Sequence, residues 1–282
     1  MKLIADSGST KTDWRLISSD EVIASFQTEG LNPYFKSIED ILEVLKADVL
    51  PNIKDVTLIS SIYFYGAGCS STEKSKIIEN AFRSLFVSSK VIVEHDLLGA
   101  AIALCGDKKG IAVILGTGSN SCLFDGRNIV KEQSSLGYIL GDEGAGSNIG
   151  KQLITDFLYQ NMPVHMSVQL QEKFNLSKDL ILDKIYKEPL ANRYLASFLK
   201  WVGEYIDDEE YLQTLVLNSF DNFFKQHIIN YPDYKECSVN VVGSVGYFFK
   251  EYLHIIAFKH EVKLGNIIRT PIEGLIDYHL TK

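Results

Sequence analysis

One pattern occurs twice in this chain and constrains its fold more than any other feature. A short strand, a turn rich in Gly, Ser and Thr, and a returning strand are predicted first around Asp6 and again around Gly116. The likeness between the two copies is one of topology more than of literal sequence. No linker or low-complexity segment separates the halves that they open. The repetition therefore indicates a duplicated fold.

Strand and helix patterns alternate along the rest of the first half. Further strands are predicted at Val22–Thr28, Val56–Tyr65 and Val91–Val93. Ser37 is suited to cap a helix with apolar residues at helical spacing, and a second such helix covers Ile77–Leu85. The second half is predicted to be largely helical from Gly144 until a strand at Val239–Val242, with a last helix after Pro271. Strands that alternate with helices indicate an α/β sheet with helical cover.

Charge and hydropathy narrow the range of partners. The 36 acidic and 28 basic residues give a formal net charge of −8, and nucleic-acid binding draws on Lys and Arg clusters, so we expect no nucleic-acid partner. No stretch approaches the roughly 20 apolar residues of a membrane-spanning helix. Charged residues near the N-terminus also leave no room for the apolar core of a signal peptide. We therefore expect no membrane partner. The four cysteines and six histidines are dispersed, which suggests no metal site and fits a reducing compartment, the cytoplasm.

The first turn carries groups that suit phosphate and magnesium. Backbone N–H groups in a tight turn can hold phosphate oxygens, and Gly8 allows a close approach. The hydroxyls of Ser9 and Thr10 and the charge of Lys11 add donors. Asp6, at the end of a buried strand, is placed to hold Mg²⁺ through water. Taken alone, an ordinary polar hairpin explains this turn about as well.

The second turn, at Gly116, Thr117 and Gly118, also offers backbone N–H groups, glycines and a hydroxyl, but no carboxylate. Two such turns could clamp a nucleotide from opposite sides, because phosphoryl transfer depends mainly on positioning and charge neutralisation. A third turn, Gly243–Ser244, follows a predicted strand and precedes a helix. A flat base or a ribose can lie against such bare backbone.

Asp96 ends a predicted strand and begins an Ala-rich helix. A kinase that attacks through a sugar hydroxyl needs a carboxylate beside that hydroxyl to accept its proton. The local sequence by itself favours a plain helix N-cap, for which Asp is a common residue.

The stretch Gly137–Ser147 holds the adjacent carboxylates Asp142 and Glu143 among four glycines, just before a helix. Ordering so many glycines costs entropy, which a close approach to a polyhydroxyl ligand would explain. Asp142 could accept two sugar hydroxyls, and the N–H groups at the helix start could hold a carbonyl or a phosphate. The alternative is a mobile acidic loop.

Together these motifs resemble the BadF/BadG/BcrA/BcrD ATPase family, in particular its N-acetylglucosamine kinase-like branch within the actin/hexokinase/Hsp70 superfamily. The resemblance covers nearly the whole chain and is most specific in three segments, Asp6–Thr12, Leu115–Asn120 and Gly141–Gly144. It implies two ribonuclease-H-like lobes of the actin-like ATPase type, residues 1–107 and 108–282, with a nucleotide cleft between them and helical additions on the second lobe.

The resemblance also assigns roles residue by residue. Asp6 matches the Mg²⁺-associated aspartate, and Asp96 matches the catalytic base, which reverses the local preference for a cap. The first phosphate loop is matched by Ser9, Thr10 and Lys11, the second by Gly116, Thr117 and Gly118, and the adenosine turn by Gly243 and Ser244. The positions matched to sugar binding are Asn32, Gly66, Asp96, Gly137 and Asp142.

These roles predict an enzyme that uses ATP and Mg²⁺ to phosphorylate an amino sugar, with N-acetylglucosamine converted to its 6-phosphate as the best candidate. Two departures bear on the acceptor: Leu136 stands where the animal sugar kinases tend to carry a tryptophan, and the second half is short. Glucosamine and N-acetylmuramic acid are other acceptors. The alternative functions are a regulatory or activator-type ATPase and a non-catalytic sugar or nucleotide sensor. A homodimer is the assembly to expect first, because homodimers are the commonest oligomers.

Overall fold

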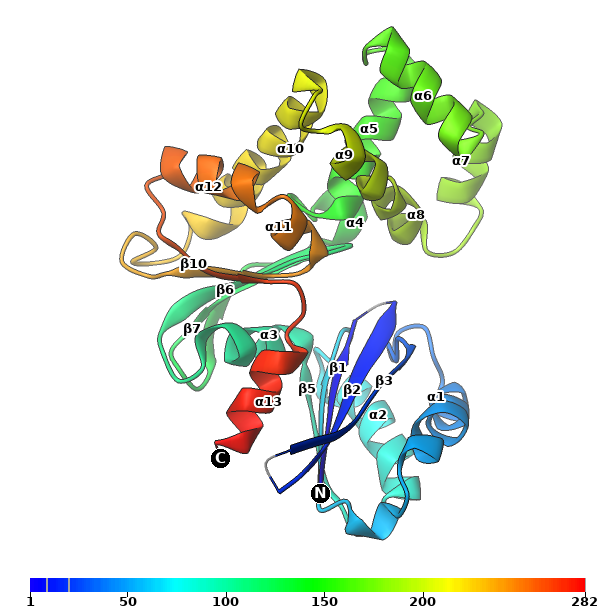
Figure 1. Ribbon diagram of the computed structural model, residues 1–282, viewed down its shortest axis with the longest axis vertical. Helices are drawn as coiled ribbons and strands as arrows, with labels where there is room; N and C mark the ends of the chain where they lie inside the picture. The colour runs from blue at the N-terminus through cyan, green and yellow to red at the C-terminus, as the bar shows by residue number, and fades with distance from the viewer. Residues whose placement is uncertain (9, 20, 282) are drawn as a thin grey trace. The chain divides into compact units, whose positions relative to one another are not determined.

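The computed structural model describes residues 1–8, 10–19 and 21–281. The chain divides into two compact units. Unit 1 comprises Met1–Lys108, Asp125–Ile129 and Thr270–Lys282, and unit 2 comprises Lys109–Phe124 and Val130–Arg269. Each unit is built on a five-stranded sheet covered by helices, which confirms the α/β prediction (Figure 1).

The sheet of unit 1 has the strand order β3-β2-β1-β4-β5. Its strands are β1 (Lys2–Ser7), β2 (Lys11–Ser18), β3 (Glu21–Glu29), β4 (Ser61–Gly66) and β5 (Lys90–His95). The first three strands form an antiparallel meander, whereas β4 and β5 run parallel to β1. Apolar side chains between the sheet and α2 form the core, with Trp14, Phe64 and Phe82 in mutual ring contact.

The helices of unit 1 include the predicted ones. They are α1 (Ile38–Val44), α2 (Thr72–Leu85), α3 (Asp96–Cys105) and α13 (Ile272–Leu280), with short turns η1 (Leu45–Val49), η2 (Leu50–Asn52) and η3 (Val56–Leu58). The Ser37 cap is confirmed as a capping box, in which Ser37 accepts the Asp40 N–H and Asp40 accepts the Ser37 N–H. The last helix, α13, packs on α3 and β1.

The strand predicted at Val56–Tyr65 is wrong in its first half. Val56–Leu58 forms a 3₁₀ turn, and β4 begins only at Ser61. Asp55 causes the difference, because its carboxylate accepts the N–H and the hydroxyl hydrogen of Thr57 and so closes a turn. An apolar run alone does not distinguish a strand from a short helical turn.

The sheet of unit 2 repeats this topology, in the order β10-β9-β6-β7-β8. Its strands are β6 (Gly110–Leu115), β7 (Ser119–Phe124), β8 (Ile129–Glu132), β9 (Val239–Val242) and β10 (Leu264–Ile268). The β6–β7 pair is antiparallel, and β9 and β10 are parallel to β6, as β4 and β5 are to β1. The predicted duplication is confirmed. The sequence reading missed β10.

Unit 2 differs from unit 1 in its large helical part. Its helices are α4 (Gly137–Leu140), α5 (Gly146–Tyr159), α6 (Val164–Phe174), α7 (Lys178–Tyr186), α8 (Ala191–Ser197), α9 (Leu199–Tyr205), α10 (Glu210–Phe223), η4 (Phe224–Ile228), α11 (Ser244–Phe248) and α12 (Lys250–Lys259). Their apolar faces and the sheet share one core that contains Trp201, Phe198 and Phe220. Within the described ranges, no helix combines the length and the hydrophobicity needed to cross a membrane.

Candidate active site

Parallel strands bring three predicted site positions of unit 1 to one edge of its sheet. Ser7 pairs with Gly66, and Gly66 pairs with His95, so β1, β4 and β5 end in one row. Asp6 lies one residue before this row, and Asp96 lies one residue after it. The carboxyl ends of parallel strands form the edge at which α/β sheets bind ligands.

Asp6 and Asp96 influence each other at this edge. Burial, followed by the charges of Asp96 and then Asp13, raises the pKa of Asp6 to about 7, against the opposing effect of Lys11. Carboxylates that repel one another in this way are stabilised by a cation. The arrangement therefore fits a divalent metal ion held mainly through water, as Mg²⁺ often is.

Asp96 is not the N-cap of α3, so the local reading of this residue as a cap is wrong. The cap position is His95, which makes no side-chain capping hydrogen bond, and Asp96 is the first helical residue. Its carboxylate oxygen Oδ1 lies 3.1 Å from His95 Nε2. A carboxylate at this position, in the first turn of a helix, is stabilised by the helix dipole.

The first turn is formed by backbone and charge contacts. The Gly8 N–H donates to the Lys11 carbonyl over 3.0 Å, and Lys11 Nζ lies 2.8 Å from Asp13 Oδ2. The Lys11 side chain is half exposed, and Thr10 is exposed. Ser9, the first residue predicted to bind phosphate, lies outside the described residues.

The loop after β4 lies against the loop that holds Asn32. Gly68 has a φ of +84°, and a Cβ there would lie 2.3 Å from Asn32 Oδ1, so only glycine allows this approach. Asn32 Oδ1 accepts the Tyr34 N–H, which fixes the orientation of the amide and leaves the Nδ2 hydrogens as its donors. Cys69 of this loop lies close enough to Asp96 to be affected by its charge. Burial, and then the Asp96 charge, raise the pKa of the Cys69 thiol to about 12. Unit 1 therefore brings Asn32, Gly66 and Asp96 into one neighbourhood.

The corresponding edge of unit 2 joins the second and third predicted turns. Gly243 has a φ of +125°, and a Cβ on it would lie 2.2 Å from the Leu115 carbonyl oxygen and 3.1 Å from the Gly116 nitrogen. Glycine is thus required where β9 ends beside β6. Ser244 then begins α11 directly next to the second turn.

A cavity of about 960 Å³ opens from these two turns into the helical part of unit 2. Its wall combines backbone of the turns with apolar and charged side chains of α9, α11 and α12. Six of the residues that line it are Gly116, Thr117, Lys200, Glu204, Ser244 and Phe248. A cavity of this size and mixed lining fits a nucleoside, and the second turn contributes Gly116 and Thr117 to its wall.

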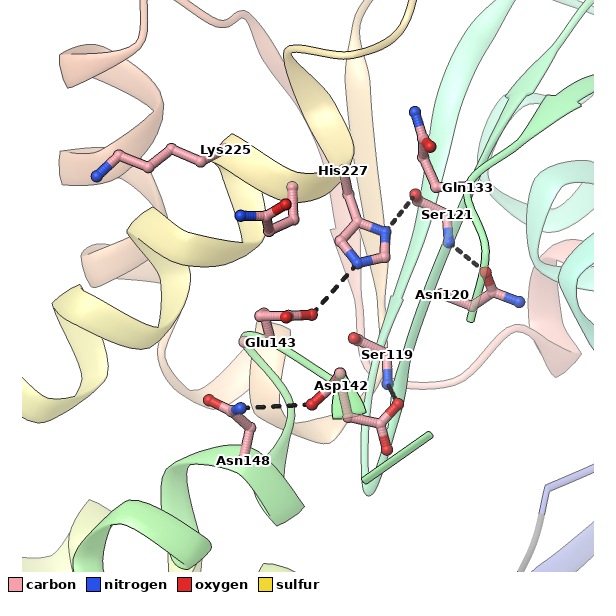
Figure 2. Close-up of polar contacts among 12 residues, drawn as sticks. Ser119, Asn120, Ser121, Gln133, Asp142, Glu143, Asn148, Lys225 and His227 are labelled. Atoms are coloured by element: carbon pink, nitrogen blue, oxygen red, sulfur yellow. Dashed lines mark hydrogen bonds and ion pairs between the residues drawn. The ribbon is translucent and has the colours of Figure 1, made fainter. Parts of the chain in front are cut away.

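Asp142 supports the second turn from the loop before α5. Its Oδ1 accepts the Ser119 N–H over 3.2 Å (Figure 2), and its Oδ2 accepts the Ser147 hydroxyl over 3.4 Å. A Cβ on Gly118 would lie 3.0 Å from the same Oδ2. The carboxylate is buried, which raises the pKa of Asp142, and its backbone φ is +58°. These hydrogen bonds join the loop to the second turn and to α5, which favours the prediction of an ordered binding loop over that of a mobile acidic loop.

The first two N–H groups of α5 are already used within the protein, contrary to the expectation that the helix start holds a carbonyl or a phosphate of the ligand. The Gly146 N–H donates to the Gly116 carbonyl over 2.9 Å, and the Ser147 N–H donates to the Thr117 carbonyl over 3.0 Å. These donors hold the second turn in place instead. The second turn is thus fixed from one side by the helix and from the other by Asp142.

Gly137 begins the single turn of α4, with a φ of +70°. Its carbonyl accepts the Gly141 N–H over 2.8 Å, which closes the turn just before Asp142. Leu136, Ile139 and Leu140 on this turn are exposed. Leu136 therefore presents an aliphatic surface at the position where a tryptophan was noted in the animal enzymes.

Two features of the site were missed in the sequence. The Ser119 hydroxyl is buried and makes no hydrogen bond to any described residue, although it lies beside Asp142. An orphaned hydroxyl of this kind fits a ligand that completes its bonding. Glu143 faces the buried His227, which comes from η4, more than 80 residues later. Only the position of Ser119 directly after the second turn could have been noticed beforehand.

Comparisons with known proteins agree with these features. No model of a known protein family matches the chain. A solved structure from Porphyromonas gingivalis, named a putative N-acetylglucosamine kinase, is 40% identical with a TM-score of 0.96, covering 100% of this chain and 99% of that chain. The N-acetylmuramic acid/N-acetylglucosamine kinase of Clostridium acetobutylicum is 29% identical over 216 residues, 70% of this chain and 68% of the relative.

A more distant likeness concerns the fold alone. A ROK family glucokinase from Streptomyces griseus, solved with glucose and AMPPNP, is 12% identical with a TM-score of 0.59, over 98% of this chain and 97% of that chain. This likeness confirms the predicted two-lobed fold of the actin-like ATPases and sugar kinases.

Proposed function

The chain is an ATP-dependent sugar kinase of the family to which the Porphyromonas gingivalis protein belongs, and we propose that its acceptor is N-acetylglucosamine, phosphorylated on the 6-hydroxyl. The observation that carries the proposal is the pair of carboxylates, Asp6 and Asp96, that meet at one sheet edge of unit 1. A sugar kinase needs one carboxylate near the metal and one beside the attacking hydroxyl.

Asp96 is the proposed general base. Asp96 is the first residue of α3 and directly follows β5, so the sheet sets its position. It accepts the proton of the sugar hydroxyl as the oxygen attacks the γ-phosphorus, and ADP leaves. His95, 3.1 Å from Asp96, orients the carboxylate.

Asp6 is the proposed residue that holds the hydrated metal ion of the nucleotide. Mg²⁺, when bound, neutralises the charge on the phosphates. Gly8, Thr10 and Lys11 of the first turn, together with Ser9, are proposed to bind phosphate oxygens, as are Gly116, Thr117 and Gly118 of the second. The cavity beside Gly243 and Ser244 is proposed to take the adenosine.

The sugar is proposed to contact Asn32 and Gly66 in unit 1 and Gly137 and Asp142 in unit 2. The Asn32 amide offers two N–H donors, and Asp142 retains lone pairs beyond those used by Ser119 and Ser147. N-acetylglucosamine as acceptor is supported by the names of both relatives, each of which includes this sugar. N-acetylmuramic acid, named for the Clostridium enzyme, is the second candidate acceptor.

Burial of the cysteines argues against the activator-type ATPase. Cluster ligation between subunits requires thiolates at the surface, typically four in total. Cys69, Cys122 and Cys237 are buried, and Cys105 is half-buried. Assignment to the BadF/BadG/BcrA/BcrD branch, cytoplasmic location and a homodimer stay predictions.

The test is ADP release from Mg-ATP with a panel of N-acetylglucosamine, N-acetylmuramic acid, glucosamine and glucose. We expect the highest kcat/KM with N-acetylglucosamine, and a product whose phosphorus is coupled to the C6 protons in NMR spectra. An equal response to all four sugars would contradict the acceptor assignment. ADP release that no sugar stimulates would contradict the kinase function and favour a regulatory ATPase, and the absence of both turnover and stimulation would favour a sensor.

A further inference from the structure

Glu143, the neighbour of Asp142, lies at the end of a series of buried polar side chains to which the proposed function gives no role. Its Oε2 lies 3.6 Å from His227 Nε2, and the side chain is about one quarter exposed whereas the His227 side chain is buried. Figure 2 shows the imidazole between Ser121 on one side and Glu143 on the other. The series continues from Ser121 to the Tyr231 hydroxyl.

The Glu143 carboxylate indicates which tautomer His227 adopts. The Gln133 N–H donates to the Tyr231 oxygen over 3.1 Å, and Tyr231 and Ser121 share a hydrogen bond of 2.8 Å in which either hydroxyl can donate. Ser121 Oγ lies 3.2 Å from His227 Nδ1. A carboxylate that faces Nε2 favours the neutral tautomer with its hydrogen on Nε2, in which Nδ1 accepts from the Ser121 hydroxyl.

The neutral state of His227 is consistent with its surroundings. The ring stacks on Phe223 with centroids 4.7 Å apart, and burial lowers the pKa of His227 although Glu143 raises it in part. The imidazole therefore presents its Nε2–H toward Glu143 Oε2 at 3.6 Å, an electrostatic contact that is longer than a direct hydrogen bond. The other oxygen of the carboxylate has no hydrogen bond to any described residue.

Asp142 and Glu143 differ in how their oxygens are used. Both Asp142 oxygens accept hydrogen bonds that hold the second turn. Glu143 faces His227 over 3.6 Å, remains partly exposed, and lies next to the loop backbone, with its Oε2 3.6 Å from where a Cβ on Gly141 would be. A restrained, partly exposed carboxylate is suited to accept hydroxyl hydrogens, because its orientation is set before the ligand arrives.

We propose that Glu143 is a second sugar-binding carboxylate, accepting a hydrogen bond from a ring hydroxyl of the acceptor, and that His227 is its positioning residue. This inference rests on the proposed function, since it requires a sugar in the neighbourhood of Asp142. It makes Glu143 a determinant of which hydroxyl pattern the enzyme accepts.

The first experiment uses the full chain with Glu143→Gln, which keeps the shape and the contact to His227 but removes the charge. We expect the KM for N-acetylglucosamine to rise roughly tenfold or more, with the KM for ATP unchanged within about twofold. Glu172→Gln on α6, an exposed glutamate far along the chain, is the matched control and should behave as wild type. Thermal unfolding checks that each variant is folded.

The second experiment identifies the hydroxyl. Analogues of N-acetylglucosamine that lack the hydroxyl at C1, C3 or C4 are compared in the wild type and in Glu143→Gln. For one analogue, the loss of kcat/KM seen in the wild type should shrink at least threefold in the variant, which is the coupling expected of contacting groups. Equal losses in both enzymes for all three analogues would overturn the contact.

The third experiment separates positioning from folding. His227→Gln keeps an N–H donor that can reach Glu143, whereas His227→Leu removes it. We expect the sugar KM to rise more in His227→Leu than in His227→Gln, with ATP KM unchanged in both. A lower unfolding temperature with an unchanged sugar KM would overturn the role of His227 in positioning.

The outcomes distinguish this inference from the function on which it rests. If the wild type shows no sugar-stimulated ADP release, the proposed function fails and the inference fails with it. If the wild type is stimulated and Glu143→Gln has the wild-type sugar KM, the inference alone is overturned.

Discussion

The two sheets have one topology and carry different chemistry at the same place. In unit 1 the last two pairs of the central hairpin are Asp6 with Asp13 and Ser7 with Thr12. In unit 2 the corresponding pairs are Ile114 with Asn120 and Leu115 with Ser119. Strand β1 therefore carries a carboxylate, Asp6, one residue before its end. Strand β6 carries only apolar side chains at its end and is followed by a glycine-containing turn.

In the proposed function, the two copies of this topology contribute different kinds of group. The edge of unit 1 supplies ionisable side chains directly from strand ends, at Asp6 and Asp96. The edge of unit 2 supplies backbone and a cavity, and its carboxylates, Asp142 and Glu143, come from a loop that helices hold in place. A duplicated fold can therefore provide charge from one half and shape from the other.

The largest expected effect comes from removing the charge that unit 1 places after β5. Asp96→Asn should lower kcat by roughly 1,000-fold, because general-base catalysis contributes on that order, and ATP affinity should change little. Steady-state kinetics and nucleotide titration measure the two quantities. The control is Asp48→Asn, which removes an exposed carboxylate of the same unit. Full activity in Asp96→Asn would contradict the proposal that unit 1 supplies the general base.

A smaller effect is expected at the strand end that has no charged counterpart in unit 2. Asp6→Asn should lower kcat/KM by roughly 100-fold and raise the Mg²⁺ concentration needed for half-maximal rate, since the residue is proposed to hold the hydrated ion. Asp13→Asn should cost less than about tenfold, because Asp13 is paired with Lys11 and Gln27. Equal effects of the two substitutions would contradict a special role for Asp6.

On the side of unit 2, the backbone itself should be the sensitive element. Gly243→Ala places a Cβ 2.2 Å from the Leu115 carbonyl oxygen at a φ of +125°, so we expect a loss of about 2–4 kcal/mol in the free energy of unfolding. Urea denaturation measures it. Gly203→Ala in α9 is the control, because its Cβ would meet only ordinary contact at 3.7 Å, and it should be neutral or slightly stabilising.

The smallest effect concerns the helical part that only unit 2 has. Burial would raise the pKa of Asp221, but hydrogen bonds from Lys225, Lys259 and His260 together outweigh it and lower the pKa. Asp221→Asn should cost about 1–2 kcal/mol of unfolding free energy at pH 7, because Lys225 of η4 and Lys259 at the end of α12 lose the anion with which they pair.

The pH dependence of that cost has a definite sign. A carboxylate whose pKa is lowered by folding contributes fully above its unfolded pKa, about 3.9, and the contribution is lost as the pH falls toward the folded value. The difference between wild type and Asp221→Asn should therefore be constant above about pH 5 and shrink below about pH 4. A difference that grows on acidification would contradict the assignment.

Much of the architecture was predictable because it depends on local sequence. The two hairpins, the Ser37 cap and the helical stretch after Gly144 follow from turn chemistry and periodicity within a few residues. Local patterns failed where a side chain bonds to nearby backbone, as the Asp55 carboxylate does when it accepts the Thr57 N–H before β4. They also failed for β10, a five-residue strand that contains glycine and asparagine and is defined by pairing with β9.

The site was predictable only one residue at a time. The sequence determined which turns could bind phosphate and which carboxylates could carry chemistry, because those properties belong to the residues and their neighbours. Tertiary structure decided that Asp96 acts on Asp6, that the helix α5 donors hold the second turn, and that His227 orients Glu143. These pairs lie tens of residues apart in the chain, and only the packing of strands and helices sets the distances between them.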